Sequence, residues 1–148
     1  MIESSNRIIL LVEDNEDDVF LTERAFAEAG CRNLLRVVMD GEEAVNYLAG
    51  EGKFSNREEH PFPSLILLDL KLPYRSGLEI LRWMRSKEML GRAMVAVLTS
   101  SNEPNDLKSA YELGTNTYLV KPPTPQAIHD IKRAFQLDWL SCKELPPR

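Results

Sequence analysis

The sequence predicts an α/β fold, with a doubly wound parallel sheet and helices on both of its faces. Two observations lead to this prediction. Strand and helix patterns alternate five times along the chain, an order typical of consecutive right-handed βαβ units. The strand segments are short, continuous apolar runs bounded by turn residues, which is the pattern of strands buried on both faces.

The regular structure is predicted to begin with a strand and a helix. Residues 8–12 are all apolar and form the first strand. Asn15 can cap a helix that runs to about Gly30, and Asp17 and Asp18 fall in its first turn, where the helix dipole favours acids. The apolar stripe of this helix consists of Val19, Phe20, Ala25, Phe26 and Ala29.

A second strand, a short helix and a long loop are predicted next. The strand covers residues 34–39, and Asp40 with Gly41 opens the helix. The apolar positions of this helix are Ala44, Val45, Tyr47 and Leu48. The polar stretch 50–63 is predicted to be a loop, and residues 65–69 form the third and most apolar strand.

The second half of the chain continues the same alternation. The third helix is marked by Leu78, Ile80, Leu81, Met84 and Met89. A strand at 94–98 precedes a helix at about 104–113, which a glycine ends. The last strand covers 117–120, and a proline suited to a first helical turn opens a final helix at about 125–140.

Size and composition indicate one globular domain that binds neither nucleic acid nor membrane. The 148 residues suit one domain with a full core, and the net charge of -5 argues against a basic nucleic-acid-binding surface. No apolar stretch approaches the roughly 20 residues that a membrane span needs, and the polar start is no signal peptide. We therefore expect a cytoplasmic protein, with Cys31 and Cys142 as reduced thiols.

Charged and hydroxyl side chains follow four of the predicted strands. These residues are, in chain order, Glu13, Asp14, Asp69, Thr99, Ser100 and Lys121. Because the carboxyl ends of parallel strands meet at one edge of the sheet, we expect these side chains to lie together where ligands bind. Carboxylates held close raise one another's pKa unless a cation sits among them, and Mg2+ is the natural occupant.

This set of side chains suits transfer of a phosphoryl group to a carboxylate. An aspartate such as Asp69 can act as a nucleophile and form an acyl phosphate. The transfer requires in-line positioning and neutralisation of the phosphoryl oxygens. A divalent ion, the ammonium of Lys121 and the hydroxyl of Thr99 can each serve one of these oxygens.

In order and spacing, these residues resemble those of response-regulator receiver domains over nearly the whole chain. Asp69 within Leu68-Asp69-Leu70-Lys71-Leu72-Pro73, followed by Gly77, resembles the family's phosphoacceptor and its Pro-x-x-x-Gly loop. The other matching positions are Glu13, Asp14, Thr99, Tyr118, Lys121 and Pro122. The resemblance implies the strand order 2-1-3-4-5, a receiver domain over residues 5–141, a tail over 142–148, and no output domain. It also makes Lys121–Pro122 a candidate cis peptide bond.

The resemblance further implies that a partner histidine kinase phosphorylates Asp69, with Thr99 and Lys121 assisting the transfer. The implied Mg2+ ligands are the side chains of Asp14 and Asp69, Glu13 through water, and the backbone carbonyl of Lys71, and Mn2+ or another divalent ion can substitute. Thr99 would then be drawn inward, and Tyr118 would turn into the space left. The face formed by the fourth helix, the fifth strand and the fifth helix would change as a result.

Three segments resemble a narrower group, the regulators that serve cyanobacterial and bacterial phytochrome kinases. They are residues 50–54, 109–113 and 139–146. This resemblance implies a phytochrome-type kinase as partner and a light sensor upstream. Members of the group are stand-alone receivers and often dimeric. Because the final helix has apolar positions to spare, we expect a homodimer formed through the fourth helix, the fifth strand and the fifth helix.

Some positions depart from the common receiver pattern. Ser100 stands where alanine or glycine is usual, which narrows access to Asp69, and Arg75-Ser76 replaces an apolar-acidic pair. Lys71 lies two residues past Asp69, and we expect it to alter the lifetime of the acyl phosphate. His60 and His129 have no partner at metal-ligand spacing, so both are predicted to be surface residues.

Other interpretations stay open at this point. An aspartate-dependent phosphatase also uses a nucleophilic aspartate, but it would want an acid two residues after Asp69, where Lys71 stands. A receiver-like interaction module that has lost phosphorylation is a second alternative, against which the intact Asp14, Asp69, Thr99 and Lys121 argue. Acids that only cap the following helices are a third, which leaves Lys121 unexplained. The favoured interpretation is a phosphoacceptor signalling switch and not an enzyme. Its own chemistry is expected to be limited to self-phosphorylation from small donors and autodephosphorylation.

Overall fold

A computed structural model describes residues 8–31, 34–72, 75–87, 93–100 and 104–134. The strands are β1 (Ile9–Val12), β2 (Leu35–Val38), β3 (Leu65–Asp69), β4 (Val95–Thr99) and β5 (Thr117–Val120). The helices are α1 (Glu16–Glu28), α2 (Gly41–Ala49), the 3-10 helix η3 (Gly52–Phe54), α3 (Gly77–Ser86), α4 (Pro104–Glu112) and α5 (Pro125–Ala134). No helix in these described ranges is long and apolar enough to cross a bilayer.

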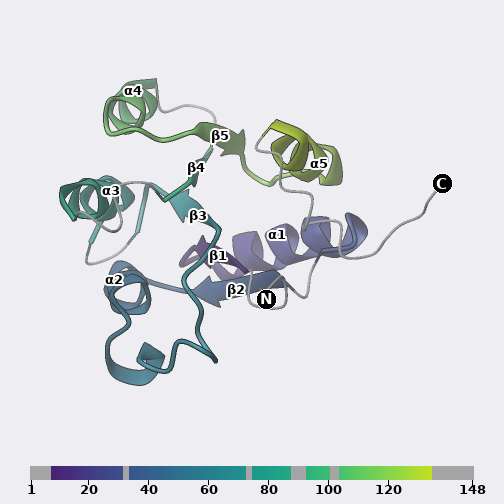
Figure 1. Cartoon of the computed structure of the whole chain (residues 1–148). Coiled ribbons are helices and arrows are strands. Elements are labelled where there is room, and N and C mark those ends of the chain that lie inside the picture. Colours follow the sequence, from purple (N-terminus) through teal and green to yellow (C-terminus); the bar gives the residue numbers. More distant parts are fainter. Residues whose placement is uncertain (1–7, 32–33, 73–74, 88–92, 101–103, 135–148) are drawn as a thin grey trace.

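The five strands form one parallel sheet in the order β2-β1-β3-β4-β5, which confirms the predicted fold (Figure 1). Helices α2, α3 and α4 lie on one side of the sheet, and α1 and α5 lie on the other (Figure 1). The register pairs Val12 with Leu68, Asp69 with Leu98, and Thr99 with Val120. The carboxyl ends of β1, β3, β4 and β5 therefore reach the same edge of the sheet.

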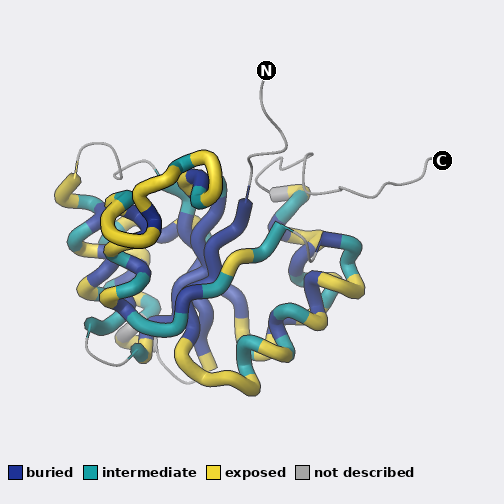
Figure 2. Tube along the Cα trace, turned by 90° about the horizontal axis from the view of Figure 1, so that it is seen from below, coloured by how far each residue is buried: buried dark blue, intermediate teal, exposed yellow. Residues whose placement is uncertain are grey.

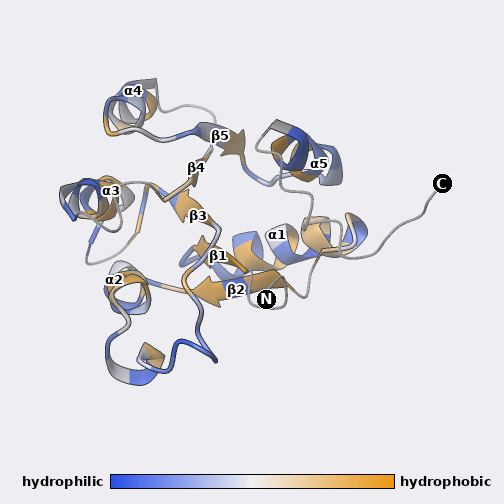
Figure 3. Ribbon diagram, viewed as in Figure 1, coloured by the Kyte–Doolittle hydropathy of each residue, from blue (hydrophilic) through white to orange (hydrophobic). Residues whose placement is uncertain are grey.

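The core is divided by the sheet into two clusters. Side chains of β1, β3 and β4 alternate between the clusters, because successive residues of a strand point to opposite faces. One cluster includes Leu10, Ile66 and Val97 with side chains of α2, α3 and α4, and the other includes Leu11 and Leu67 with side chains of α1 and α5. The central strands are buried throughout (Figure 2) and strongly hydrophobic (Figure 3). This burial on both faces explains why the strands are continuous apolar runs.

Helix α1 is capped as predicted, but its apolar stripe differs from the prediction. The side chain of Asn15 accepts a hydrogen bond from the backbone N–H of Asp18 at 2.9 Å. Phe20 is 61% exposed, whereas Thr22 is buried. At 100° per residue, position 20 lies about 120° around the helix from Phe26, so Phe20 points away from the sheet.

The region predicted as a long loop is more ordered than expected. It contains η3, and the rings of Tyr47, Phe54 and His60 pack against one another with centroids 4.9 to 5.9 Å apart. Arg57 donates hydrogen bonds to the carbonyls of Tyr47, Leu48 and His60 at 2.7 to 3.0 Å. His60, predicted to be a surface residue, is partly exposed, and its ring also packs in this aromatic cluster. His129 is exposed, as predicted.

Other element boundaries differ from the predictions by small amounts. Strand β4 extends through Thr99, one residue beyond the predicted end, and α3 ends at Ser86. Met89 and the predicted continuation of the last helix through 135–140 lie outside the described residues, as does Cys142. The Lys121–Pro122 peptide bond is cis, as the resemblance implied.

Candidate functional site

Three carboxylates meet at the carboxyl edge of the sheet. Glu13 directly follows β1, and Asp14 is the next residue, while Asp69 is the last residue of β3. One carboxylate oxygen from each of these residues lies within 4.8 Å of the others. Glu13 and Asp69 are buried and Asp14 is exposed, so the cluster is open to solvent on the side of Asp14.

Lys121 supplies the positive charge at this edge. Its Nζ lies 3.0 Å from Oδ2 of Asp69, 3.1 Å from Oε1 of Glu13 and 3.2 Å from Oδ2 of Asp18. The contacts with Asp69 and Asp18 have hydrogen-bond geometry. Oε1 of Glu13 makes no hydrogen bond with favourable angles to any described residue, so its contact with Lys121 is an ion pair only. The single ammonium of Lys121 therefore contacts three carboxylates.

The electrostatics of the edge follow from this crowding. Burial, followed by repulsion from the Asp69 carboxylate, raises the pKa of Glu13 to about 7, although Lys121 opposes the shift. Burial alone would lower the pKa of Lys121, but Asp69 and Glu13 outweigh it and raise that pKa. Hard oxygen donors with excess negative charge suit a divalent cation. The residues present therefore fit a divalent metal ion.

Backbone contacts hold the two buried carboxylates in place. The N–H of Asn15 donates to Oε2 of Glu13 at 3.2 Å, and the N–H of Lys71 donates to Oδ1 of Asp69 at 3.0 Å. Gly77 allows the chain to return close to Asp69: a Cβ at this position would overlap the Asp69 carbonyl oxygen and lie 2.6 Å from Cα of Leu70. The start of α3 can therefore approach the end of β3 only with glycine at 77.

Thr99 reaches the same edge from β4. Its neighbour Leu98 pairs with Asp69, and its carbonyl accepts a hydrogen bond from the N–H of Lys121 at 2.7 Å. The Thr99 side chain is buried, and its Oγ1 has no hydrogen-bond partner among the described residues. A buried hydroxyl without a partner is uncommon. It leaves Thr99 with a donor available for a ligand.

Tyr118 lies away from the carboxylates. Its register partner is Val97, two residues before Thr99, so Tyr118 and Thr99 are on the same face of the sheet. The Tyr118 side chain is exposed, and its ring packs edge to face on Tyr111 of α4. In this structure Tyr118 is therefore turned outward.

The sequence patterns missed one member of the site, Asp18. They assigned it to the first turn of α1 as an acid favoured by the helix dipole, but its carboxylate also binds Lys121. Asp14 lies before the N-cap Asn15 and outside α1, so helical spacing alone did not relate Asp18 to the carboxylate cluster.

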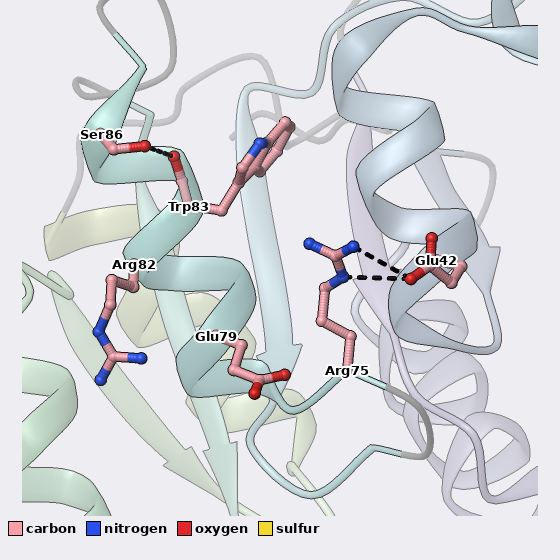
Figure 4. Close-up of a pocket in the computed structure, with 6 residues that line it drawn as sticks. All are labelled: Glu42, Arg75, Glu79, Arg82, Trp83 and Ser86. Atoms are coloured by element: carbon pink, nitrogen blue, oxygen red, sulfur yellow. Dashed lines mark hydrogen bonds and ion pairs between the residues drawn. The ribbon is translucent and has the colours of Figure 1, made fainter.

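A separate pocket lies between α2 and α3, and it contains none of these residues. Its volume is about 510 Å³, and the lining residues are Glu42, Arg75, Glu79, Arg82, Trp83 and Ser86 (Figure 4). Arg75, which lies just before α3, donates to Oε2 of Glu42 in α2 at 3.1 Å (Figure 4). The chemistry of the carboxylate edge places the functional site there and not in this pocket.

The family model of the response regulator receiver domain matches residues 9–133. This chain belongs to the response regulator receiver domain family. The match includes all five strands and the whole carboxylate edge. The receiver fold, with its five-stranded parallel sheet in the order 2-1-3-4-5, agrees with this assignment.

Individual relatives narrow the assignment to regulators associated with phytochromes. The receiver is 34% identical to the response regulator Rcp1 of Synechocystis sp. (strain PCC 6803), over 99% of each chain. A solved structure of the bacteriophytochrome response regulator RtBRR is 41% identical and superimposes with a TM-score of 0.74, covering 95% of this chain and 81% of that one. The phosphorylated cyanobacterial phytochrome response regulator RcpA is 36% identical, with a TM-score of 0.73 over 95% and 98% of the two chains. A Mn(2+)-bound form of Rcp1 has a TM-score of 0.71 over 95% and 99%.

Proposed function

We propose that this receiver accepts a phosphoryl group on Asp69 from a phytochrome-type histidine kinase and thereby switches a protein-interaction surface. The observation that carries the proposal is the placement of Asp69, whose carboxylate lies beside Glu13 and Asp14 and accepts a hydrogen bond from Lys121 at 3.0 Å. Such an edge offers a nucleophile, ligands for a cation and a fixed positive charge. The similarity to RcpA and Rcp1 supports the same conclusion.

The proposed transfer begins when a carboxylate oxygen of Asp69 attacks the phosphorus of phosphohistidine. An O–P bond forms, the P–N bond breaks, and the electron pair of that bond returns to the imidazole. Lys121 faces the charge that develops on the phosphoryl oxygens, and the hydroxyl of Thr99 donates a hydrogen bond to one of them. The unpartnered state of Oγ1 of Thr99 in the unphosphorylated protein supports this role.

Mg2+ is the proposed cofactor, and Mn2+ or another divalent ion can replace it. Asp14 and Asp69 would hold the ion directly, Glu13 would hold it through water, and the backbone carbonyl of Lys71 would complete the protein ligands. When bound, the ion neutralises the charge that gathers on the phosphoryl group. A structure of the similar regulator Rcp1 is a Mn(2+)-bound form, which supports a divalent ion as the cofactor of this receiver.

The proposed switch uses Thr99 and Tyr118. Once Thr99 is drawn toward the phosphoryl group, Tyr118 turns inward from its exposed position, and the surface of α4, β5 and α5 changes. This surface has an apolar character because three large hydrophobic side chains of α4 and β5 are exposed on it: Tyr111, Tyr118 and Val120. We propose that it forms a homodimer. The receiver domain is proposed to span residues 5–141, with a tail at 142–148, and a cytoplasmic location is proposed.

Incubation with acetyl phosphate and Mg2+, followed by intact mass spectrometry, tests the central step. The wild type should gain the mass of one phosphoryl group, while Asp69→Asn gains none and Asp17→Asn, which changes an exposed acid, behaves as wild type. Continuous consumption of acetyl phosphate would instead indicate an aspartate-dependent phosphatase. No gain by the wild type would indicate an interaction module without phosphorylation.

Two further measurements test the proposed partners. Phosphotransfer from each histidine kinase of the organism should be fastest from a phytochrome-type kinase. Light scattering at high protein concentration should give a dimer mass, and a monomer mass both with and without phosphorylation would exclude the proposed dimer.

A further inference from the structure

The ammonium of Lys121 donates hydrogen bonds to residues of two different elements of the fold. Of its two contacts with hydrogen-bond geometry, one reaches Asp69 at the end of β3, and the other reaches Asp18 in the first turn of α1. An ammonium has three N–H donors. One of the three is therefore taken by a carboxylate that does not belong to the candidate metal ligands, because the cluster of oxygens within 4.8 Å comprises Glu13, Asp14 and Asp69.

The position of Asp18 is fixed by the helix that carries it. Its backbone N–H donates to Oδ1 of Asn15 at 2.9 Å, and this bond caps α1. The cap and the neighbouring turn set the direction of the side chain, which is 29% exposed. Lys121 is less accessible, with a side chain that is 15% exposed. The contact is therefore better shielded from water than an ordinary surface ion pair, which contributes little.

Lys121 and a divalent cation compete for the same oxygens. Nζ of Lys121 lies 3.0 Å from Asp69 and 3.1 Å from Glu13, and both residues belong to the candidate metal cluster. If the ammonium binds tightly to these two carboxylates, it neutralises much of the negative charge that would attract a cation. If a third carboxylate also binds the ammonium, more of that negative charge stays available to the cation.

We propose that Asp18 is a positioning residue that holds Lys121 toward α1 and thereby keeps Glu13 and Asp69 available to the divalent cation. This inference extends the proposed function by assigning to Asp18 the control of cation affinity at that site. Asp18 acts through Lys121 and touches neither the cation nor the phosphoryl group. Without the carboxylate at 18, the ammonium binds Glu13 and Asp69 alone, and a cation must displace it further.

Isothermal titration of the unphosphorylated protein with Mn2+ and with Mg2+ tests this inference. Asp18→Asn should weaken binding by about fivefold more than Asp17→Asn. The matched control removes the same charge from the same helical turn, but Asp17 is not among the described carboxylates that contact Lys121. Asp18→Glu, which keeps the carboxylate, should restore most of the affinity. Circular dichroism and thermal melting establish that each variant is folded.

A double-mutant cycle shows whether Asp18 acts through Lys121. In a Lys121→Gln background, Asp18→Asn and Asp17→Asn should weaken cation binding equally. Equal affinities of these two variants in the wild-type background, or an excess effect of Asp18→Asn that persists without Lys121, would overturn the inference. Because these titrations need no phosphoryl donor, they remain decisive even if the wild type gains no phosphate, a result that would instead defeat the proposed function.

Discussion

The ring of Tyr118 on β5 meets the ring of Tyr111 on α4 edge to face, with centroids 6.5 Å apart and an interplanar angle of 89°. Such a contact contributes about 0.5–1.5 kcal/mol, and less where the rings are exposed. It stabilises the outward position of Tyr118. The contact therefore opposes the inward turn that the proposed switch requires.

Replacing Tyr111 should shift this balance toward the inward position. In Tyr111→Leu the edge-to-face contact is lost, so the inward population of Tyr118 should rise before phosphorylation, while Tyr111→Phe should retain the wild-type balance. Fluorine NMR of fluorotyrosine-labelled protein, assigned with Tyr118→Phe, measures the populations. An unchanged resonance of Tyr118 in Tyr111→Leu would show that the pair does not control the switch.

Lys71 is expected to lengthen the life of the acyl phosphate. Its backbone N–H donates to Oδ1 of Asp69, and its side chain is exposed. We expect the aliphatic stem to restrict the approach of water to the proposed phosphoacceptor. Lys71→Asn should therefore shorten the dephosphorylation half-life, by about twofold to fivefold for an effect below about 1 kcal/mol. Lys71→Met, which keeps the stem without the charge, separates shielding from electrostatics. Equal half-lives for wild type and Lys71→Asn would remove the role.

Gly77→Ala should destabilise the protein through a steric clash. The added Cβ would overlap the Asp69 carbonyl oxygen and lie 2.6 Å from Cα of Leu70, so backbone must move. We expect a loss of about 1–3 kcal/mol in the free energy of unfolding, measured with urea. Gly52→Ala is an informative control, because nothing lies within 4 Å of a Cβ there and only its positive φ of 63° resists the change.

Replacing Arg85 by lysine should destabilise the protein even though the positive charge is kept. The guanidinium donates to the carbonyls of Ala93, Leu113 and Gly114 at 2.9 to 3.1 Å, and so joins the end of α3 to the segments before β4 and after α4. Lysine cannot reproduce this planar arrangement of donors. Arg85→Lys should lower the free energy of unfolding by about 1–3 kcal/mol, whereas Arg82→Lys on the exposed side of α3 should have little effect. Similar urea midpoints for the two variants would contradict this.

The sequence was sufficient to predict the sheet and the charged residues at its edge, for a physical reason. Strands buried on both faces must be apolar, so the acids Glu13 and Asp69 mark the carboxyl ends of β1 and β3. Parallel pairing then brings these two residues to one edge. The family match covers the segments that carry these residues. Their roles in phosphorylation stay predictions.

Contacts between distant side chains and backbone carbonyls could not be predicted in this way. Arg57 orders the region after α2 by binding carbonyls nine and ten residues earlier in the chain, and every residue has a carbonyl, so no pattern distinguishes these. The pairing of Asp18 with Lys121, 103 residues apart, requires the packing of α1 beside α5. Phe20 was misassigned because apolar character was given more weight than helical position.

The close approach at Gly77 has a mechanical consequence. The backbone N–H of Gly77 binds the carbonyl of Leu70 at 3.0 Å, and no side chain separates the first turn of α3 from the peptide of Asp69. The end of β3 and the start of α3 are therefore mechanically coupled. A displacement of α3 toward β3 must move the backbone of Asp69 and Leu70 with it, because glycine has no side chain that could adjust its rotamer instead.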